Sequence, residues 1–197
     1  QNFRKYNWTW PITGKGLGTL SLSSALTQSD DVVFYQVGQK LDQVDKNLLP
    51  NLARAFGLGS ATGIELAESA GNIPDPNKGL WRPGDAINMV IGQGDVLASP
   101  IQITDMMAAI ANGGTLYVPH LVARMSSLAD GTEKIFPTDS RGKLPVSAAT
   151  LTSIRQALSR VTTDKDGTAY SAFRGAKISV AGKTGTAEVF KTGEPHS

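Results

Sequence analysis

The run Gly-Lys-Thr-Gly at residues 182–185 is the clearest candidate for chemistry in this sequence. The triplet Gly-Lys-Thr within it occurs in two unrelated kinds of site: a phosphate-binding loop, and the strand edge of an enzyme that transfers acyl groups through a serine. A phosphate-binding loop needs a glycine five positions before the glycine of this triplet and a helix after it. Here the earlier position is Lys177, and "TAEVF" followed by "KTGEP" does not predict a helix. The run therefore favours a strand-edge site over a nucleotide site.

A strand at this position would suit a substrate that contains peptide bonds. Ile178 and Val180 alternate with polar neighbours, and β-branched residues continue beyond them, so the pattern predicts a strand at about 176–190. On its edge, the lysine and threonine would present an ammonium and a hydroxyl to a cleft, and the glycine would leave room for a substrate. Edge amides could pair with an extended peptide and stabilise a developing oxyanion.

The elements that must position this strand are mainly helices. Helical spacing of apolar residues is found at 19–28, 32–41, 49–60, 99–114 and 147–163. The clearest case begins with Ser99 as N-cap and Pro100 at the first helical position, and Gly113 ends it. Residues 59–97 are rich in turn-forming residues, and 115–122 is expected to be an extended edge segment.

A short polar connection separates the first two predicted helices. Ser29, Asp30 and Asp31 follow one helix and directly precede the next. Polar side chains on such a tight connection could face a cleft, although a Ser-Asp-Asp turn also serves as an ordinary helix cap. The connection is therefore a second candidate for the site.

Composition limits the remaining possibilities. The 197 residues are 40% hydrophobic with a net charge of +2, which is typical of one packed domain. The absence of cysteine excludes disulfides and thiol chemistry, and two isolated histidines do not predict a metal site. No apolar run is long enough to predict a membrane span, and no signal-like start is present, so we expect any membrane anchor to lie outside this chain.

Four segments in order resemble the transpeptidase domain of high-molecular-mass penicillin-binding proteins. They are "SDD" at 29–31, "IGQGDVLASPIQITDMMAAIANGG" at 91–114, "DGTAY" at 166–170 and "GKTGTAEVF" at 182–190. The family's catalytic motifs are Ser-x-x-Lys, Ser-x-Asn and Lys-Thr-Gly. "YQVGQKL" and "TGIELAE" are similar to the elongation, or cell-shape, subgroup of class B. The resemblance implies an α+β fold like that of serine β-lactamases, here mainly its helical part (about 1–165) plus the Lys-Thr-Gly strand.

The resemblance also implies a mechanism, in which a serine is acylated by a peptidoglycan stem peptide ending in D-Ala-D-Ala, or by a β-lactam. Ser29 would relay a proton to the leaving nitrogen, and Lys183 would supply positive charge beside it. Thr184 and Thr186 would bind the substrate carboxylate, with the Thr186 amide in the oxyanion hole, and Gly185 would keep the edge open. No cofactor, metal or nucleic acid is implied.

Two departures from the family pattern stand out. Nothing upstream of Ser29 fits Ser-x-x-Lys, so the nucleophile is expected outside this chain. The formal match from Ser140 to Lys143 lies between the other motifs in a polar segment that is expected to be a turn-like loop. Asp31 occupies the position where the family usually has asparagine, and an ionised carboxylate can accept hydrogen bonds there but cannot donate one.

Alternatives from other classes stay open on the sequence. The chain could belong to a non-catalytic scaffold of cell-wall assembly, or to a β-lactam sensor or serine β-lactamase. A β-lactamase would need a glutamate on a loop suited to activating water, and no segment is assigned to that role. The turn-rich segment contains Glu65 and Glu68, but it resembles the penicillin-binding pattern better. The expected location is the extracytoplasmic face of the bacterial cytoplasmic membrane, with stem peptides, β-lactams and cell-wall assembly proteins as partners.

Overall fold

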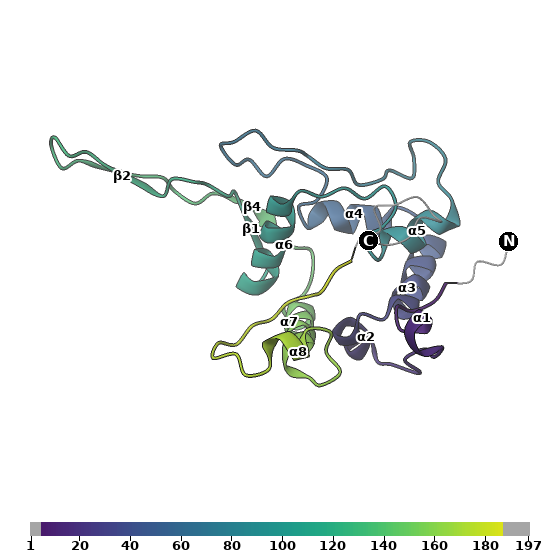
Figure 1. The fold of residues 1–197 in the computed structure, drawn as a ribbon. Helices are drawn as coiled ribbons and strands as arrows, with labels where there is room; N and C mark the ends of the chain where they lie inside the picture. Colours follow the sequence, from purple (N-terminus) through teal and green to yellow (C-terminus); the bar gives the residue numbers. More distant parts are fainter. Residues whose placement is uncertain (1–4, 187–197) are drawn as a thin grey trace. The chain divides into compact units, whose positions relative to one another are not determined.

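The computed structural model describes residues 5–186 of the chain (Figure 1). The chain divides into two compact units. Unit 1 comprises Gln1–Val44, Arg82–Gly94 and Ser153–Ser197; unit 2 comprises Asp45–Trp81 and Asp95–Thr152.

Unit 1 is helical throughout the regular part of its described residues. Its helices are α1 (Trp10–Thr13), α2 (Leu22–Gln28), α3 (Asp31–Val44), α5 (Pro83–Met89), most of α7 (Ala148–Thr163) and α8 (Tyr170–Phe173). The Ser21 hydroxyl caps α2 by accepting a hydrogen bond from the Ser24 amide at 3.1 Å. The predicted helices at 19–28, 32–41 and 147–163 are confirmed, with α2 starting three residues late. The sequence pattern did not predict α1, α5 or α8.

Close backbone packing joins α3 to α5. Gly38 is buried in α3, and a Cβ atom there would lie 2.9 Å from both the Ala86 carbonyl oxygen and Val90 Cγ1. Only glycine allows the two helices to approach this closely. The capping of α5 comes from Asp85, whose carboxylate accepts a hydrogen bond from the Arg82 amide at 2.7 Å.

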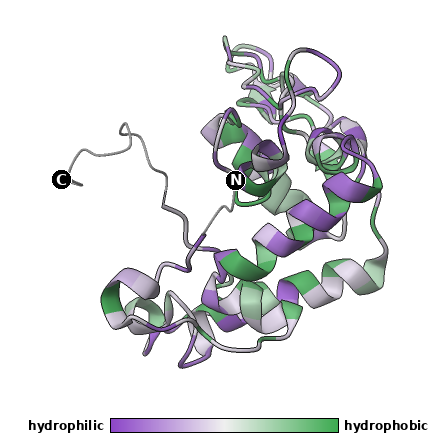
Figure 2. Cartoon of the chain, turned by 90° about the vertical axis from the view of Figure 1, so that its right-hand side faces the viewer, coloured by the Kyte–Doolittle hydropathy of each residue, from purple (hydrophilic) through white to green (hydrophobic). Residues whose placement is uncertain are grey.

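Helix α7 supplies the apolar centre of unit 1. Ala157, Leu158 and Val161 are almost fully buried on one face of the helix. Hydrophobic and hydrophilic residues alternate around the helices in Figure 2, as expected for amphipathic helices at a surface. A direct link runs to α2, because the fully buried Thr27 hydroxyl contacts the Ala157 carbonyl oxygen at 3.3 Å. This link matters for the site, since α2 ends at Ser29.

Unit 2 combines two helices with two small antiparallel sheets. Its elements are α4 (Leu48–Ala55), α6 (Pro100–Asn112), β1 (Thr115–Tyr117), β2 (Arg124–Ser126), β3 (Glu133–Ile135) and β4 (Ser140–Lys143). β1 pairs with β4, with Thr115 opposite Lys143 and a bulge after Leu116; β2 pairs with β3, with Met125 opposite Lys134. The predicted caps of α6 are confirmed: Ser99 forms a reciprocal capping box, and Gly113 ends the helix with φ 95°.

The turn-rich segment before α6 is held by one buried side chain. Gln102 is 1% exposed, and its amide nitrogen donates to the carbonyl oxygens of Ser60 and Ala70 at 2.6 and 2.9 Å. An ion pair of 2.8 Å from Arg141 on β4 to the buried Asp105 on α6 joins helix and sheet. The loop is thus ordered by polar contacts to α6.

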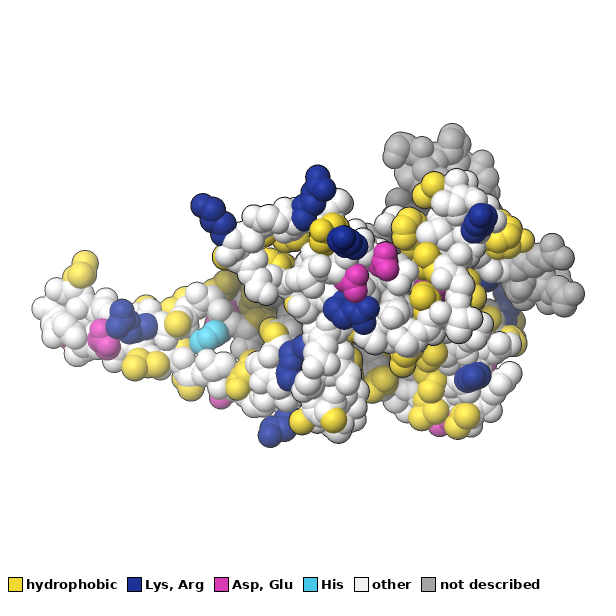
Figure 3. All heavy atoms as spheres, turned by 90° about the horizontal axis from the view of Figure 1, so that it is seen from below, with side chains coloured by type: hydrophobic (Ala, Val, Ile, Leu, Met, Phe, Trp, Pro, Cys, Tyr) yellow, Lys and Arg dark blue, Asp and Glu magenta, His cyan; other side chains and the backbone are white. Residues whose placement is uncertain are grey.

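The hairpin of β2 and β3 extends away from β1 and β4 in unit 2 (Figure 1). Its two strands are exposed on both faces, and hydrophobic side chains lie along it (Figure 3). Met125, Leu128 and Ile135 are the exposed large ones on this hairpin. The sequence pattern did not predict it.

Two expectations require correction. Residues 176–186 form no strand, and residues 187–190 of the predicted strand lie outside the described part. A strand needs a hydrogen-bonded neighbour, and this backbone instead forms hydrogen bonds to α7. Ser140–Lys143 is a paired strand, β4, rather than a turn-like loop. Over residues 5–186, no helix has the length and apolar character needed to cross a bilayer.

Candidate active site

The Ser29 backbone has an unusual conformation that follows from its place between two helices. Ser29 ends α2 with φ 54° and ψ 49°, and it is the one non-glycine residue with positive φ among residues 5–186. The left-handed conformation costs a residue with a side chain roughly 1–2 kcal/mol. Strain of this kind is concentrated at functional sites, where surrounding contacts maintain it.

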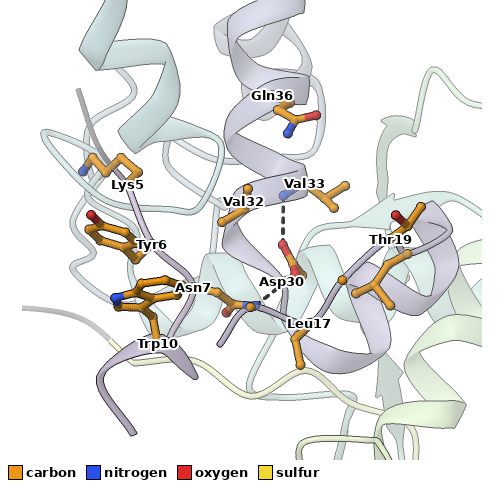
Figure 4. A pocket seen from close by; sticks show the side chains of 13 residues that line it. Lys5, Tyr6, Asn7, Trp10, Leu17, Thr19, Asp30, Val32, Val33 and Gln36 are labelled. Carbon is orange, nitrogen blue, oxygen red and sulfur yellow. Dashed lines mark hydrogen bonds between the residues drawn. The ribbon is translucent and has the colours of Figure 1, made fainter. Parts of the chain in front are cut away.

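Asp30 supplies those contacts (Figure 4). It is 4% exposed, and one carboxylate oxygen accepts from the Val33 amide at 2.9 Å, which caps the first turn of α3. The other oxygen accepts from Asn7 Nδ2, also at 2.9 Å. Asn7 and Asp30 line a cavity of about 460 Å³ within unit 1. The buried, hydrogen-bonded pair of Asn7 and Asp30 therefore holds the turn that carries Ser29.

Lys183 meets Ser29 directly. The Lys183 ammonium donates to Ser29 Oγ at 2.7 Å and to the Thr184 carbonyl oxygen at 2.9 Å. Both residues belong to unit 1. The structure thus joins the Ser-Asp-Asp and Lys-Thr-Gly motifs, which are 154 residues apart in the chain.

Helix α7 holds the segment that carries Lys183. The Thr162 hydroxyl donates to the Val180 carbonyl oxygen, and the Gly182 amide donates to the Leu158 carbonyl oxygen at 3.2 Å. These two bonds fix the backbone on both sides of residue 181. These two hydrogen bonds, and not a strand as the sequence pattern predicted, position the segment that carries Lys183.

The charged groups of the site shift each other's pKa values. Desolvation raises the pKa of Asp31; the Lys183 charge opposes this, Asp30 adds to it, and Lys5 opposes it. Desolvation of the ammonium lowers the pKa of Lys183, although the residue as a whole is exposed, and the Asp31 charge opposes that shift. A lowered lysine pKa brings the ammonium closer to proton transfer at neutral pH.

Thr184, Gly185 and Thr186, the remaining predicted site residues, are exposed, and two of them form hydrogen bonds. Thr184 Oγ1 lies 2.7 Å from Thr168 Oγ1, and the Thr186 carbonyl oxygen accepts from Gln93 Nε2 at 3.3 Å. A Cβ atom at Gly185 would meet nothing within 4 Å, so this side of the backbone is open. Hydroxyls, an ammonium and open backbone together can receive a carboxylate.

Sequence reasoning missed the supporting residues. Thr168 and Gln93 lie in "DGTAY" and "IGQG", segments that carried the family resemblance without an assigned role. Asn7 and Asp30 had no sequence signal beyond the possibility of a cap. Ser140 and Lys143 do not form the helical Ser-x-x-Lys motif of the family, because both lie on strand β4. Side chains three residues apart on a strand point to opposite faces.

Comparisons with known proteins give the family. The penicillin binding protein transpeptidase domain matches residues 2–197. The chain is 33% identical to peptidoglycan D,D-transpeptidase MrdA of Haemophilus influenzae, over 94% of this chain and 29% of that protein. The Escherichia coli MrdA is 35% identical, over 89% of this chain and 28% of that protein. The chain thus spans about 30% of the length of these curated relatives.

Solved structures agree with the sequence matches. Penicillin-binding protein PBP2 of Helicobacter pylori, solved in complex with MreC, has a TM-score of 0.70 and 32% identity, covering 93% of this chain and 32% of that one. PBP2 of Pseudomonas aeruginosa has a TM-score of 0.75 and 28% identity, covering 93% and 41%. The expected α+β fold and the class B, elongation-type resemblance are confirmed. This chain belongs to the penicillin-binding protein transpeptidase family.

Proposed function

We propose that this chain is part of a peptidoglycan D,D-transpeptidase, which cross-links stem peptides through a serine acyl-enzyme and is acylated by penicillin. The observation that carries the proposal is the 2.7 Å hydrogen bond from Lys183 to Ser29. It joins two catalytic motifs of the family in the geometry that proton transfer requires. The acylating serine belongs to a segment outside residues 1–197.

In the first step, that serine attacks the carbonyl carbon of the penultimate D-alanine. A bond forms between the serine oxygen and the carbonyl carbon, and the negative charge on the carbonyl oxygen is stabilised by the Thr186 amide. The hydroxyl proton of the attacking serine passes through the lysine of its own Ser-x-x-Lys motif to Ser29, and Ser29 delivers a proton to the nitrogen of the terminal D-alanine as the C–N bond breaks. Lys183 stabilises Ser29 as it gives up its proton.

In the second step, an amine of a neighbouring strand attacks the ester. The new C–N bond forms as the bond to the serine oxygen breaks, and the amine's proton returns through Ser29. In the first step the Thr184 and Thr186 hydroxyls hold the carboxylate of the terminal D-alanine, which leaves with that residue, and in both steps Gly185 leaves space beside the backbone. Asp31 accepts hydrogen bonds from the substrate amide and from the nucleophile's lysine.

The glutamates of the turn-rich segment support transpeptidation over β-lactam hydrolysis. Glu68 accepts three hydrogen bonds of 2.8 Å, from the amides of Thr62 and Gly63 and from the Thr62 hydroxyl. These bonds lower the pKa of Glu68, which makes it a poor base. Glu65 accepts from the Leu121 amide at 3.1 Å. Both carboxylates therefore hold loops of unit 2 in place by accepting hydrogen bonds from backbone amides.

The proposal extends to location and partners. The protein acts at the extracytoplasmic face of the cytoplasmic membrane, where its substrate lies, held there by a segment outside this chain. The Helicobacter pylori relative was solved in complex with MreC. We accordingly place this protein with cell-wall assembly partners of that kind.

Intact mass after incubation with excess benzylpenicillin tests the proposal. The intact gene product is expected to gain one penicilloyl adduct, and peptide mapping is expected to place it outside residues 1–197. Isolated residues 1–197 are expected to gain none. An adduct on a residue within this chain would overturn the position of the nucleophile, and an intact gene product without any adduct would favour a non-catalytic scaffold. Rapid loss of the adduct by hydrolysis would favour a β-lactamase.

A further inference from the structure

The turn after α7 brings a third threonine to the site. Thr168, in the segment "DGTAY", lies with its Oγ1 atom 2.7 Å from Thr184 Oγ1. Thr168 is half-buried, whereas Thr184 is exposed. The proposed mechanism uses the Thr184 hydroxyl but gives Thr168 no part.

The position of Thr168 is set by glycine packing against α7. A Cβ atom at Gly167 would lie 2.4 Å from the carbonyl oxygens of both Arg160 and Val161, so only glycine fits. The Ala169 amide donates to the Val161 carbonyl oxygen at 3.0 Å. Thr168 is thus flanked on both sides by residues that contact the last turns of α7.

The segment that leads to Thr184 is attached to the same helix. It bonds to α7 through Val180 and Gly182, which are held by Thr162 and Leu158. One short stretch of α7 therefore positions both threonines. The two backbone segments that carry these hydroxyls are thus attached to α7 separately, and the attachments bring the two side chains within hydrogen-bond distance.

Proton counting gives the contact a direction. A hydroxyl has one proton to donate and two lone pairs that accept. If the Thr184 proton is donated to a substrate carboxylate, the bond between the two hydroxyls must be donated by Thr168. We propose that Thr168 is a positioning residue, which donates to Thr184 and so orients the Thr184 hydroxyl toward the carboxylate of the stem peptide or β-lactam. This inference rests on the proposed function.

A pair of β-lactams with and without the carboxylate isolates this role. The acylation rate of the intact gene product is measured with benzylpenicillin and with its methyl ester, for the parent, Thr168→Val, Thr168→Ala and Thr168→Ser. We expect Thr168→Val and Thr168→Ala to be acylated by benzylpenicillin roughly 3- to 10-fold more slowly than the parent. This is the size of effect that the loss of one neutral hydrogen bond gives. With the ester they should change less than about twofold, and Thr168→Ser should keep the parent rate with both. Ser171→Ala, at an exposed position of α8 three residues after Thr168, is the matched control and should change neither rate.

The outcomes separate this inference from the proposed function. An equal loss with acid and ester would mean that Thr168 supports the fold, and no loss with the acid would remove it from the site; either result overturns the inference. Thermal melting of each variant shows whether a rate was measured on folded protein, and Thr168→Ala serves if valine disturbs packing. If the parent itself is not acylated, the proposed function fails and this inference falls with it.

Discussion

The hydrogen bond between Lys183 and Ser29 predicts strong coupling between two residues that are distant in sequence. Ser29→Ala and Lys183→Met each remove one partner with little change in size. A hydrogen bond to a charged group contributes about 1.5–3 kcal/mol. Because Lys183 remains exposed, we take the lower end, about 1.5 kcal/mol, which corresponds to roughly tenfold in rate. Each single change should slow acylation by about 100-fold or more. The double variant should be about tenfold faster than the product of the two losses predicts.

A double-mutant cycle on the intact gene product measures this coupling. The second-order rate of acylation by a fluorescent penicillin is determined for the parent, both single variants and the double variant. Ser171→Ala combined with Lys183→Met is the control pair, and its effects should add within about 0.5 kcal/mol. If the free-energy losses in acylation caused by Ser29→Ala and Lys183→Met add within the same margin, the two side chains are not coupled in the reaction and the reasoning is refuted.

Three further predictions concern stability, each measured by thermal or denaturant unfolding. Gly167→Ala should cost about 3 kcal/mol or more, because its methyl group would meet two backbone carbonyl oxygens at 2.4 Å, whereas Gly16→Ala, with open space at its Cβ position, should be nearly neutral. Gln102→Met should cost about 2–4 kcal/mol, because the carbonyl groups of Ser60 and Ala70 lose their donor; a neutral result would remove Gln102 from its role in the loop. Asp31→Asn should raise the melting temperature at pH 7. Burial raises the pKa of Asp31 in the folded state, so its contribution to stability is full below the ordinary value of 3.8 and is lost as pH rises through the folded-state pKa. The gain from asparagine should disappear toward pH 3, and a gain that is independent of pH would contradict this cause.

The helices of this protein could be predicted from sequence because their signals are local. α6 is the clearest case: its cap at Ser99, its proline at the first position and its stop at Gly113 all lie within one segment. The strand predicted at about 176–190 illustrates the opposite situation. Alternating residues describe a segment that can pair, but pairing depends on a neighbour that the pattern cannot supply. Over residues 176–186, contacts with α7 take the place of a ladder.

The site shows the same division between local and distant signals. The motif residues Ser29 and Lys183 were identified by type and order, and the structure brings their side chains together. Their supports were not identified, because Asn7 and Asp30 are 23 residues apart and interact only once the turn is folded. A carboxylate that caps a helix while accepting from a buried amide looks, in sequence, like any acidic turn residue.

The role of α7 explains how two motifs so far apart in the chain form one site within unit 1. The helix contacts α2 through Thr27 and Ala157, two residues before Ser29, and it holds the backbone just before Lys183 through Thr162. Each attachment is short, so little freedom separates the helix from either motif. The packing of this one amphipathic helix therefore helps to set the distance between Ser29 and Lys183, together with the Asn7–Asp30 pair that holds the Ser29 turn. That packing is buried and apolar, whereas Ser29 is half-buried and Lys183 is exposed. A close-packed base beneath such polar groups suits the proposed proton transfer, since preorganised groups meet a substrate without first rearranging.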